Sequence, residues 1–111
     1  MNAGVAVVDP EVRLLAWNTR AEDLWGVRAD EAIGARLLDL DIGLPLTELG
    51  GAIDDHLGGD RHDPLTVHLD AVNRRGRPVR VRVTLTKVMN RQPSPAAAVL
   101  VMDVVDDELA G

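Results

Sequence analysis

Residues 17–26 read Trp17-Asn18-Thr19-Arg20-Ala21-Glu22-Asp23-Leu24-Trp25-Gly26. The stretch follows an apolar, strand-like run at residues 12–17 and has the pattern of a short acidic helix. Asn18 is a favoured N-cap type, and Thr19 with Glu22 forms a capping-box pattern, so either residue can begin the helix. Gly26 is a natural stop because glycine adopts the left-handed conformation without a Cβ penalty. The stretch predicts a strand that turns directly into a short helix, as also occurs at ordinary junctions in other α+β domains.

Short apolar runs, and in the second half of the chain alternating apolar and polar residues, predict strands on both sides of this stretch. The expected strands are residues 5–8, 12–17, 65–71, 79–85 and 96–104. The first two are separated by the turn signal Asp9-Pro10 and should pair antiparallel. The last run is apolar on both faces, which predicts a strand at the centre of the sheet.

The remaining helices are expected between the second and third strands. A short one, about residues 30–33, has acids in its first turn and ends at Gly34. A longer helix should begin at Pro45 or Thr47 and end at Gly58-Gly59, because its apolar stripe consists of Leu46, Leu49, Ile53 and Leu57. Gly50-Gly51 inside it costs about 1 kcal/mol per glycine relative to alanine, so the helix is either soft or closely approached there. This order of elements indicates an α+β domain with helices on one sheet face.

Composition restricts the classes of function. The chain has 111 residues, 46% of them apolar, which is enough for one globular domain. It contains no cysteine, which excludes disulfides, thiolate chemistry and cysteine-based metal sites. The longest apolar run, residues 96–102, is too short to cross a bilayer, and no signal peptide is visible before Val5. We therefore expect a cytoplasmic location and no membrane insertion.

The charge is unevenly distributed along the chain. The net charge is −6, which argues against nucleic-acid binding. Residues 1–70 hold fourteen acids and five bases, residues 71–102 hold seven bases and no acid, and the last nine residues hold four acids. The basic block is either a docking face for an acidic partner or a solvated strand face that balances the acidic helices.

Several segments together resemble the first half of a PAS domain. They are Val5-Ala6-Val7-Val8-Asp9-Pro10, Arg13-Leu14-Leu15-Ala16-Trp17-Asn18, Ala21-Glu22-Asp23-Leu24-Trp25-Gly26 and Asp30-Glu31-Ala32-Ile33-Gly34. The resemblance to PAS domains runs from about residue 4 to residue 105. It implies a central antiparallel five-stranded sheet, short helices on one face, and a last strand between the first and the fourth. One segment is similar to a narrower group, the PAS modules of chemotaxis methylesterase–methyltransferase fusion proteins and related hybrid sensor proteins; it reads Leu38-Asp39-Leu40-Asp41-Ile42-Gly43-Leu44-Pro45.

The resemblance implies a single non-enzymatic domain over residues 1–111, cut from a longer bacterial-type signalling protein such as a chemotaxis-type methyltransferase or a sensor histidine kinase of a two-component system. We expect a signal-input and protein–protein interaction module whose output domain belongs to the same full-length chain. The alternative is a sensor of an unidentified small molecule, with a cavity between helices and sheet. Candidate lining residues for that cavity are Trp17, Trp25, Leu49, Ile53, Val67 and Val81.

We expect no catalytic residue, no metal site and no cofactor. His56 flanks the apolar stripe of the longer helix, where haem-binding PAS proteins carry an iron ligand, but its surroundings do not match the haem motif. It is therefore a weak cofactor candidate against a surface or capping histidine. Light-sensing flavin PAS domains use a cysteine that this chain lacks, so the purified protein should be colourless.

Two further expectations concern the last strand. Helices should cover one of its faces, so the other face should expose side chains such as Leu100 and Met102, or their alternates. We expect this exposed face to form a homodimer interface or to be covered by a helix that is missing from this fragment. Asp103-Val104-Val105 resembles the Asp-Ile-Thr type motif that ends this strand in PAS domains. We expect Asp103 and Asp106 to carry the signal out of the domain and call them the signal-exit residues. Asp103 should pair with an arginine of the turn (Arg74, Arg75 or Arg77), and Asp106 should cap an exit helix, unless Asp103 is a solvated carboxylate at a frayed terminus.

Overall fold

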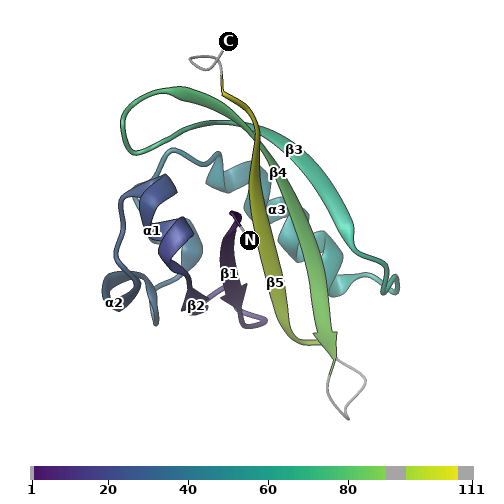
Figure 1. Cartoon of the computed structure of the whole chain (residues 1–111). Helices are drawn as coiled ribbons and strands as arrows, with labels where there is room; N and C mark the ends of the chain where they lie inside the picture. The colour runs from purple at the N-terminus through teal and green to yellow at the C-terminus, as the bar shows by residue number, and fades with distance from the viewer. Residues whose placement is uncertain (1, 90–94, 108–111) are drawn as a thin grey trace.

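Five strands form one antiparallel sheet in the computed structural model, which describes residues 2–89 and 95–107. They are β1 (Gly4–Val8), β2 (Leu14–Trp17), β3 (Leu65–Val72), β4 (Pro78–Met89) and β5 (Pro95–Asp107). The strand order is β2-β1-β5-β4-β3 (Figure 1). The predicted central position of the last strand, between the first and the fourth, is therefore confirmed.

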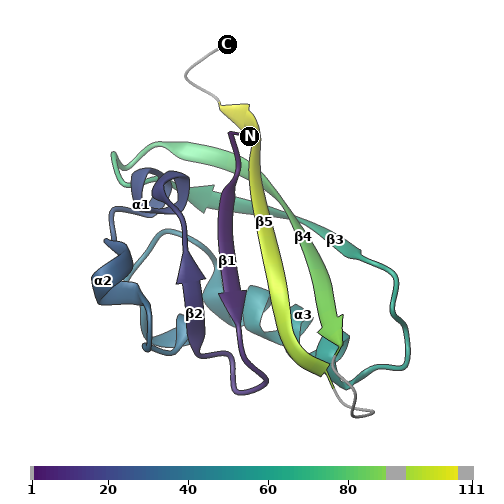
Figure 2. The same cartoon turned by 60° about the horizontal axis from the view of Figure 1, so that its bottom comes forward.

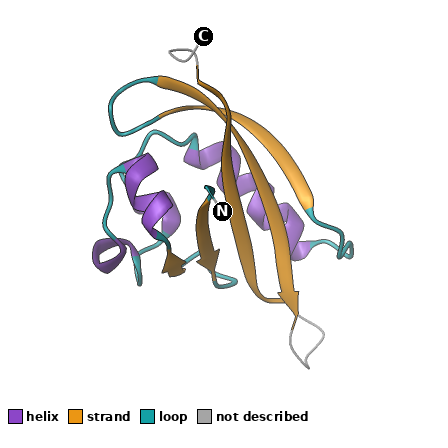
Figure 3. Ribbon diagram, viewed as in Figure 1, coloured by secondary structure: helices purple, strands orange, loops and turns teal. Residues whose placement is uncertain are grey.

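The helices lie on one side of this sheet. They are α1 (Thr19–Trp25), α2 (Ala29–Ala32), the 3-10 turn η1 (Leu37–Asp39) and α3 (Leu46–Gly58). In Figure 2, α3 passes behind the strands, and none of the described helices crosses in front of them. Figure 3 shows the same separation of helices and strands. The expected α+β architecture, with helices on one face, is confirmed.

The core between the two layers is aliphatic. Its largest fully buried side chains are Leu14, Leu37, Leu49, Ile53, Leu85, Leu100, Met102, Val8, Val81 and Val83. Trp17 and Trp25 are also buried in it. Burial of this apolar surface supplies the main stabilising free energy of the domain.

The alternation of β5 corrects one prediction. Leu100 and Met102 are 0% and 1% exposed, so they face the helices rather than the uncovered side of the sheet. Val99 and Val101, the alternates, are only partly buried and occupy the face of the sheet that the described helices leave uncovered. The sequence could not show which face of β5 packs against the helices, because both faces of this strand are apolar.

The junction at residues 17–19 is fixed by Asn18. Its Oδ1 accepts from the backbone N–H of Ala21 at 2.9 Å, so Asn18 is the N-cap of α1. The alternative capping box is not formed: Thr19 is the first helical residue, and the Glu22 carboxylate accepts from the Ala29 N–H at 2.6 Å. Gly26 ends the helix with φ 77°, as predicted.

Two close approaches position α3 and the segment before it. A Cβ on Gly50 would lie 2.7 Å from Leu38, which explains a glycine inside a helix. A Cβ on Gly43 would lie 1.7 Å from the carbonyl oxygen of Val72, while the Val72 N–H donates to the Gly43 carbonyl at 2.9 Å. Gly43 therefore holds the segment before α3 against the end of edge strand β3.

The turn between β3 and β4 is attached to α1. The Asn73 side chain accepts from the N–H groups of Arg75 and Arg77, and Gly76 has φ 77°. The Arg74 N–H donates to the Leu24 carbonyl at 2.8 Å, so it satisfies a carbonyl near the C-terminal end of α1. Residues that are some fifty positions apart in the chain are thus fixed side by side.

Candidate functional site

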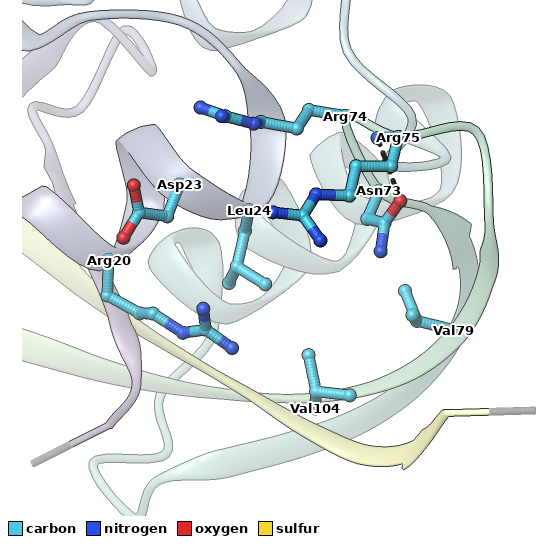
Figure 4. A pocket seen from close by; sticks show the side chains of 8 residues that line it. All are labelled: Arg20, Asp23, Leu24, Asn73, Arg74, Arg75, Val79 and Val104. Atoms are coloured by element: carbon cyan, nitrogen blue, oxygen red, sulfur yellow. Dashed lines mark hydrogen bonds between the residues drawn. The ribbon is translucent and has the colours of Figure 1, made fainter. Parts of the chain in front are cut away.

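A hollow of about 350 Å³ lies between α1 and the β3–β4 turn (Figure 4). We call it the basic pocket; it is lined by Arg20, Asp23, Leu24, Asn73, Arg74, Arg75, Val79 and Val104. Arg20 extends from α1 and Arg75 from the turn, and their guanidinium groups approach the hollow from opposite sides. Leu24, Val79 and Val104 supply apolar surface between them. Sequence analysis identified the arginine cluster of the turn but did not place it beside Arg20.

The charges around the basic pocket do not cancel. Arg20, Arg74 and Arg75 oppose the single carboxylate of Asp23, which leaves a local charge of +2 in a chain whose net charge is −6. Among the described residues, no carboxylate lies within ion-pair distance of any of the three arginines. The Arg20 Nε donates to the Asn2 carbonyl at 3.2 Å, which leaves its terminal nitrogens for other partners.

The residues predicted to line a cavity lie together in the packed core. Trp17, Trp25, Leu49, Ile53 and Val81 are buried, and Val67 packs against them partly exposed. The Trp17 indole N–H donates to the Val27 carbonyl at 2.8 Å. The Trp25 Nε1 is buried and has no hydrogen-bond partner within the described ranges. Such an orphan donor is unusual because an unmade buried hydrogen bond is costly.

His56 is neither a surface nor a capping residue. It is 7% exposed, its Nε2 has no partner among the residues described, and Lys87 of β4 lies close to it with its Nζ donating to the Gly59 carbonyl at 2.6 Å. Burial, and secondly the Lys87 charge, lower the pKa of His56 below its ordinary value, while the Leu85 backbone acts in the opposite direction. In the described part of the chain, no group of three or more His, Cys, Asp or Glu residues could hold a metal ion.

The face of the sheet opposite the described helices carries an apolar strip, which we call the valine strip. It consists of Val5 and Val7 of β1 and Val99 and Val101 of β5, which pair directly across the two strands. Thr84 and Thr86 of β4 pair with the β5 valines and continue the row. All six side chains are partly exposed.

The predicted signal-exit residues lie within β5. Asp103 pairs with Arg82 across the strands, at 3.5 Å between Oδ2 and Nη2, and not with an arginine of the turn. The prediction of its partner was wrong because the strand continues beyond Asp103, so this carboxylate faces β4 rather than the turn. Asp106 is itself in the strand, which ends at Asp107, so it does not cap a helix. Residues 108–111, where an exit helix was expected to continue, lie outside the described residues.

Comparison with known families decides the classification. A family model described as the PAS fold matches residues 1–106. The chain belongs to the PAS family. PAS domains are generally sensory, non-catalytic modules of signalling proteins, and none of the described helices is long and apolar enough to cross a membrane.

Solved PAS structures resemble this PAS domain in fold. A PAS domain from Colwellia psychrerythraea has a TM-score of 0.73 at 14% identity, over 95% of this chain and 87% of that one. The PAS domain of the RpfR quorum-sensing receptor of Cronobacter turicensis, solved in complex with BDSF, has a TM-score of 0.71 at 15% identity, over 96% of both chains. The PAS domain of histidine kinase ThkA has a TM-score of 0.70 at 18% identity, over 91% and 97%. A comparison with curated protein sequences gave no significant match.

Proposed function

We propose that this PAS domain is a non-catalytic signal-input module that forms a homodimer through the valine strip. The observation that carries the proposal is the position of this apolar strip on the central strand β5 and its neighbour β1, on the side without described helices. A contiguous apolar patch at the centre of a sheet marks an interaction surface. Thr84 and Thr86 border the strip on β4, so a second copy that covers only these six side chains buries no charge; the Asp103–Arg82 ion pair lies next to them on the same face and stays outside the contact.

Sedimentation velocity over a range of protein concentrations tests the dimer. The unmodified domain should sediment increasingly as a dimer as its concentration rises, and Val101→Lys should be monomeric because association would remove the lysine charge from water. Ile33→Lys is the matched control, since Ile33 is also an exposed apolar residue but lies at the end of α2, outside the valine strip. A monomer at all concentrations, or equal dimerisation of both variants, contradicts the proposal.

We also propose that the domain belongs to a bacterial-type signalling protein, such as a chemotaxis-type methyltransferase or a sensor histidine kinase, with the output domain in the same chain. Residues 38–45 support the first assignment, and the fold shared with the PAS domain of a histidine kinase is consistent with the second. The sequence of the full-length gene product tests this proposal. A neighbouring domain with no signalling role would contradict it.

Asp103 is the residue we propose for signal exit. Asp103→Ala in the full-length protein should reduce the change in output on stimulation, while the isolated domain stays folded, because its ion pair with Arg82 is partly exposed and contributes at most about 1 kcal/mol. Asp70→Ala is the control, since it breaks the comparable Asp70–Arg80 pair on edge strand β3. Normal signalling in the Asp103 variant, or a loss of folding, contradicts this role.

Small-molecule sensing is the second candidate function. The buried, unpartnered Trp25 Nε1 favours it, because a ligand between helices and sheet can accept that hydrogen bond. The related Cronobacter domain was solved with BDSF, which makes this compound a suitable first probe. Binding should alter the fluorescence of Trp17 and Trp25, the only aromatic residues of the chain. An unchanged spectrum, together with unchanged backbone NMR shifts on addition of BDSF, contradicts binding of this probe.

A further inference from the structure

The basic pocket has the features of a binding site. Its arginines take no part in the proposed dimer interface or in the packing of the core. Its three arginines come from two separate elements, and α1 and the β3–β4 turn are locked together by the Arg74–Leu24 backbone hydrogen bond. The Asn73 side chain, which accepts from Arg75 and Arg77, keeps the turn in shape. The backbone positions of the arginines are therefore set before any ligand arrives, which reduces the ordering cost of binding.

The charge of the basic pocket selects an anion. Guanidinium groups bind carboxylate and phosphate groups through paired hydrogen bonds, and none of the three is neutralised by a described carboxylate. The guanidinium groups of Arg20 and Arg75 approach the hollow and repel one another, whereas the Arg74 side chain extends away over α1 (Figure 4). A bound anion removes the repulsion between Arg20 and Arg75. Asp23 on the rim opposes anion binding and limits the local charge to +2.

The apolar part of the basic pocket restricts the anion further. Leu24 and Val79 are buried residues whose surfaces reach the hollow, and Val104 of β5 completes this area. A fully hydrated inorganic ion would leave that surface uncovered, whereas a short hydrocarbon attached to an anionic group would bury it. A volume of about 350 Å³ accommodates a small metabolite rather than a macromolecular segment.

We propose that the basic pocket binds a small organic anion, with its carboxylate or phosphate group held by Arg20 and Arg75 and its short apolar part against Leu24, Val79 and Val104. Val104 directly follows Asp103 in β5, so such a ligand contacts the strand next to the proposed exit residue. The site differs from the ligand position beside Trp25 considered above and does not depend on dimerisation through the valine strip.

Titration of the domain with butyrate and, separately, with propyl phosphate, which carries the same three-carbon chain on a phosphate group, tests the proposal. Backbone NMR shifts are followed at constant ionic strength, because salt alone screens surface charges. Saturable shifts should appear at residues 73–76 and along α1. Arg20→Gln and Arg75→Gln should each weaken binding roughly three- to tenfold, and Asp23→Asn should tighten it roughly two- to fivefold, since each changes one charge at a partly exposed site.

Matched variants separate this site from general charge effects. Arg61→Gln removes an arginine outside the basic pocket and should leave both titrations unchanged. The preferred probe identifies carboxylate or phosphate as the anionic group. Non-saturable shifts with both probes, or an equal effect of Arg61→Gln and Arg75→Gln, would overturn the proposal. The spectra of the unliganded variants show whether each remains folded, and the double variant Arg20→Lys/Arg75→Lys, which keeps the charge, should retain part of the binding.

Discussion

Asn18 shows how much a single side chain fixes at the residue scale. Its Oδ1 accepts from the N–H groups of Val5 and Ala21, and its Nδ2 donates to the Ala3 carbonyl at 3.1 Å. The cap of α1 therefore also attaches the start of β1. Sequence analysis identified Asn18 as a possible cap from local spacing, but the contacts to residues 3 and 5 have no local signal because they depend on how β1 and β2 pair.

Protonation of His56 should lower the stability of the domain. Its pKa is lowered in the folded state, chiefly by burial and then by Lys87, so folding favours the neutral form. Its full contribution is present above the unfolded pKa of 6.5 and is lost as the pH falls from there through the lowered folded pKa. The free energy of unfolding should therefore decrease on acidification through this range.

Denaturant unfolding at a series of pH values measures this effect. His56→Gln should flatten the decrease below pH 6.5, because glutamine is similar in polarity but does not titrate there. His62→Gln, which replaces an exposed histidine, is the control and should keep the slope of the original domain. Identical slopes in all three proteins would show that His56 is not the group responsible.

At the scale of elements, the arrangement depends on glycines that the sequence pattern only partly explains. Gly50 is in a helix because Leu38 lies against it, which matches the expectation of a close approach at this point. Gly43 is required by a backbone contact between the segment before α3 and the end of β3. The sequence identifies residues 43–45 as a break, but the partner strand begins some twenty residues later, so the contact itself could not be predicted.

Gly43→Ala should destabilise the domain by about 2–3 kcal/mol, because its Cβ would overlap the Val72 carbonyl and force the two backbones apart. The control is Gly51→Ala: it lies in α3, a new Cβ there contacts nothing, and the higher helix propensity of alanine should add up to about 1 kcal/mol. Thermal unfolding measures both changes. A Gly43 variant as stable as the original domain would contradict the proposed close contact.

At the scale of the whole molecule, sequence analysis predicted the fold better than the sites. The strand order and the aliphatic core follow from alternation and from the PAS resemblance, which cover most of the chain. The sequence could not show which face of β5 packs against the helices, since apolar residues occupy both of its faces. Arg20 and Arg75 line the same pocket although they are far apart in the sequence, and the distribution of charge along the chain does not show that they lie close together. The burial of His56 could have been expected, because it lies three residues after Ile53 in the apolar stripe of α3.

The absence of cysteine from this chain allows a direct measurement of the interface. A single Thr84→Cys variant places a thiol on β4 beside Val101, and Asp54→Cys places one on the exposed side of α3. We predict that mild oxidation converts the Thr84 variant to a disulfide-linked dimer much faster than the Asp54 variant, since a disulfide needs Cα atoms within about 7 Å of each other. Equal, slow cross-linking of the two variants, at concentrations where the unmodified domain sediments as a dimer, would contradict association through the valine strip.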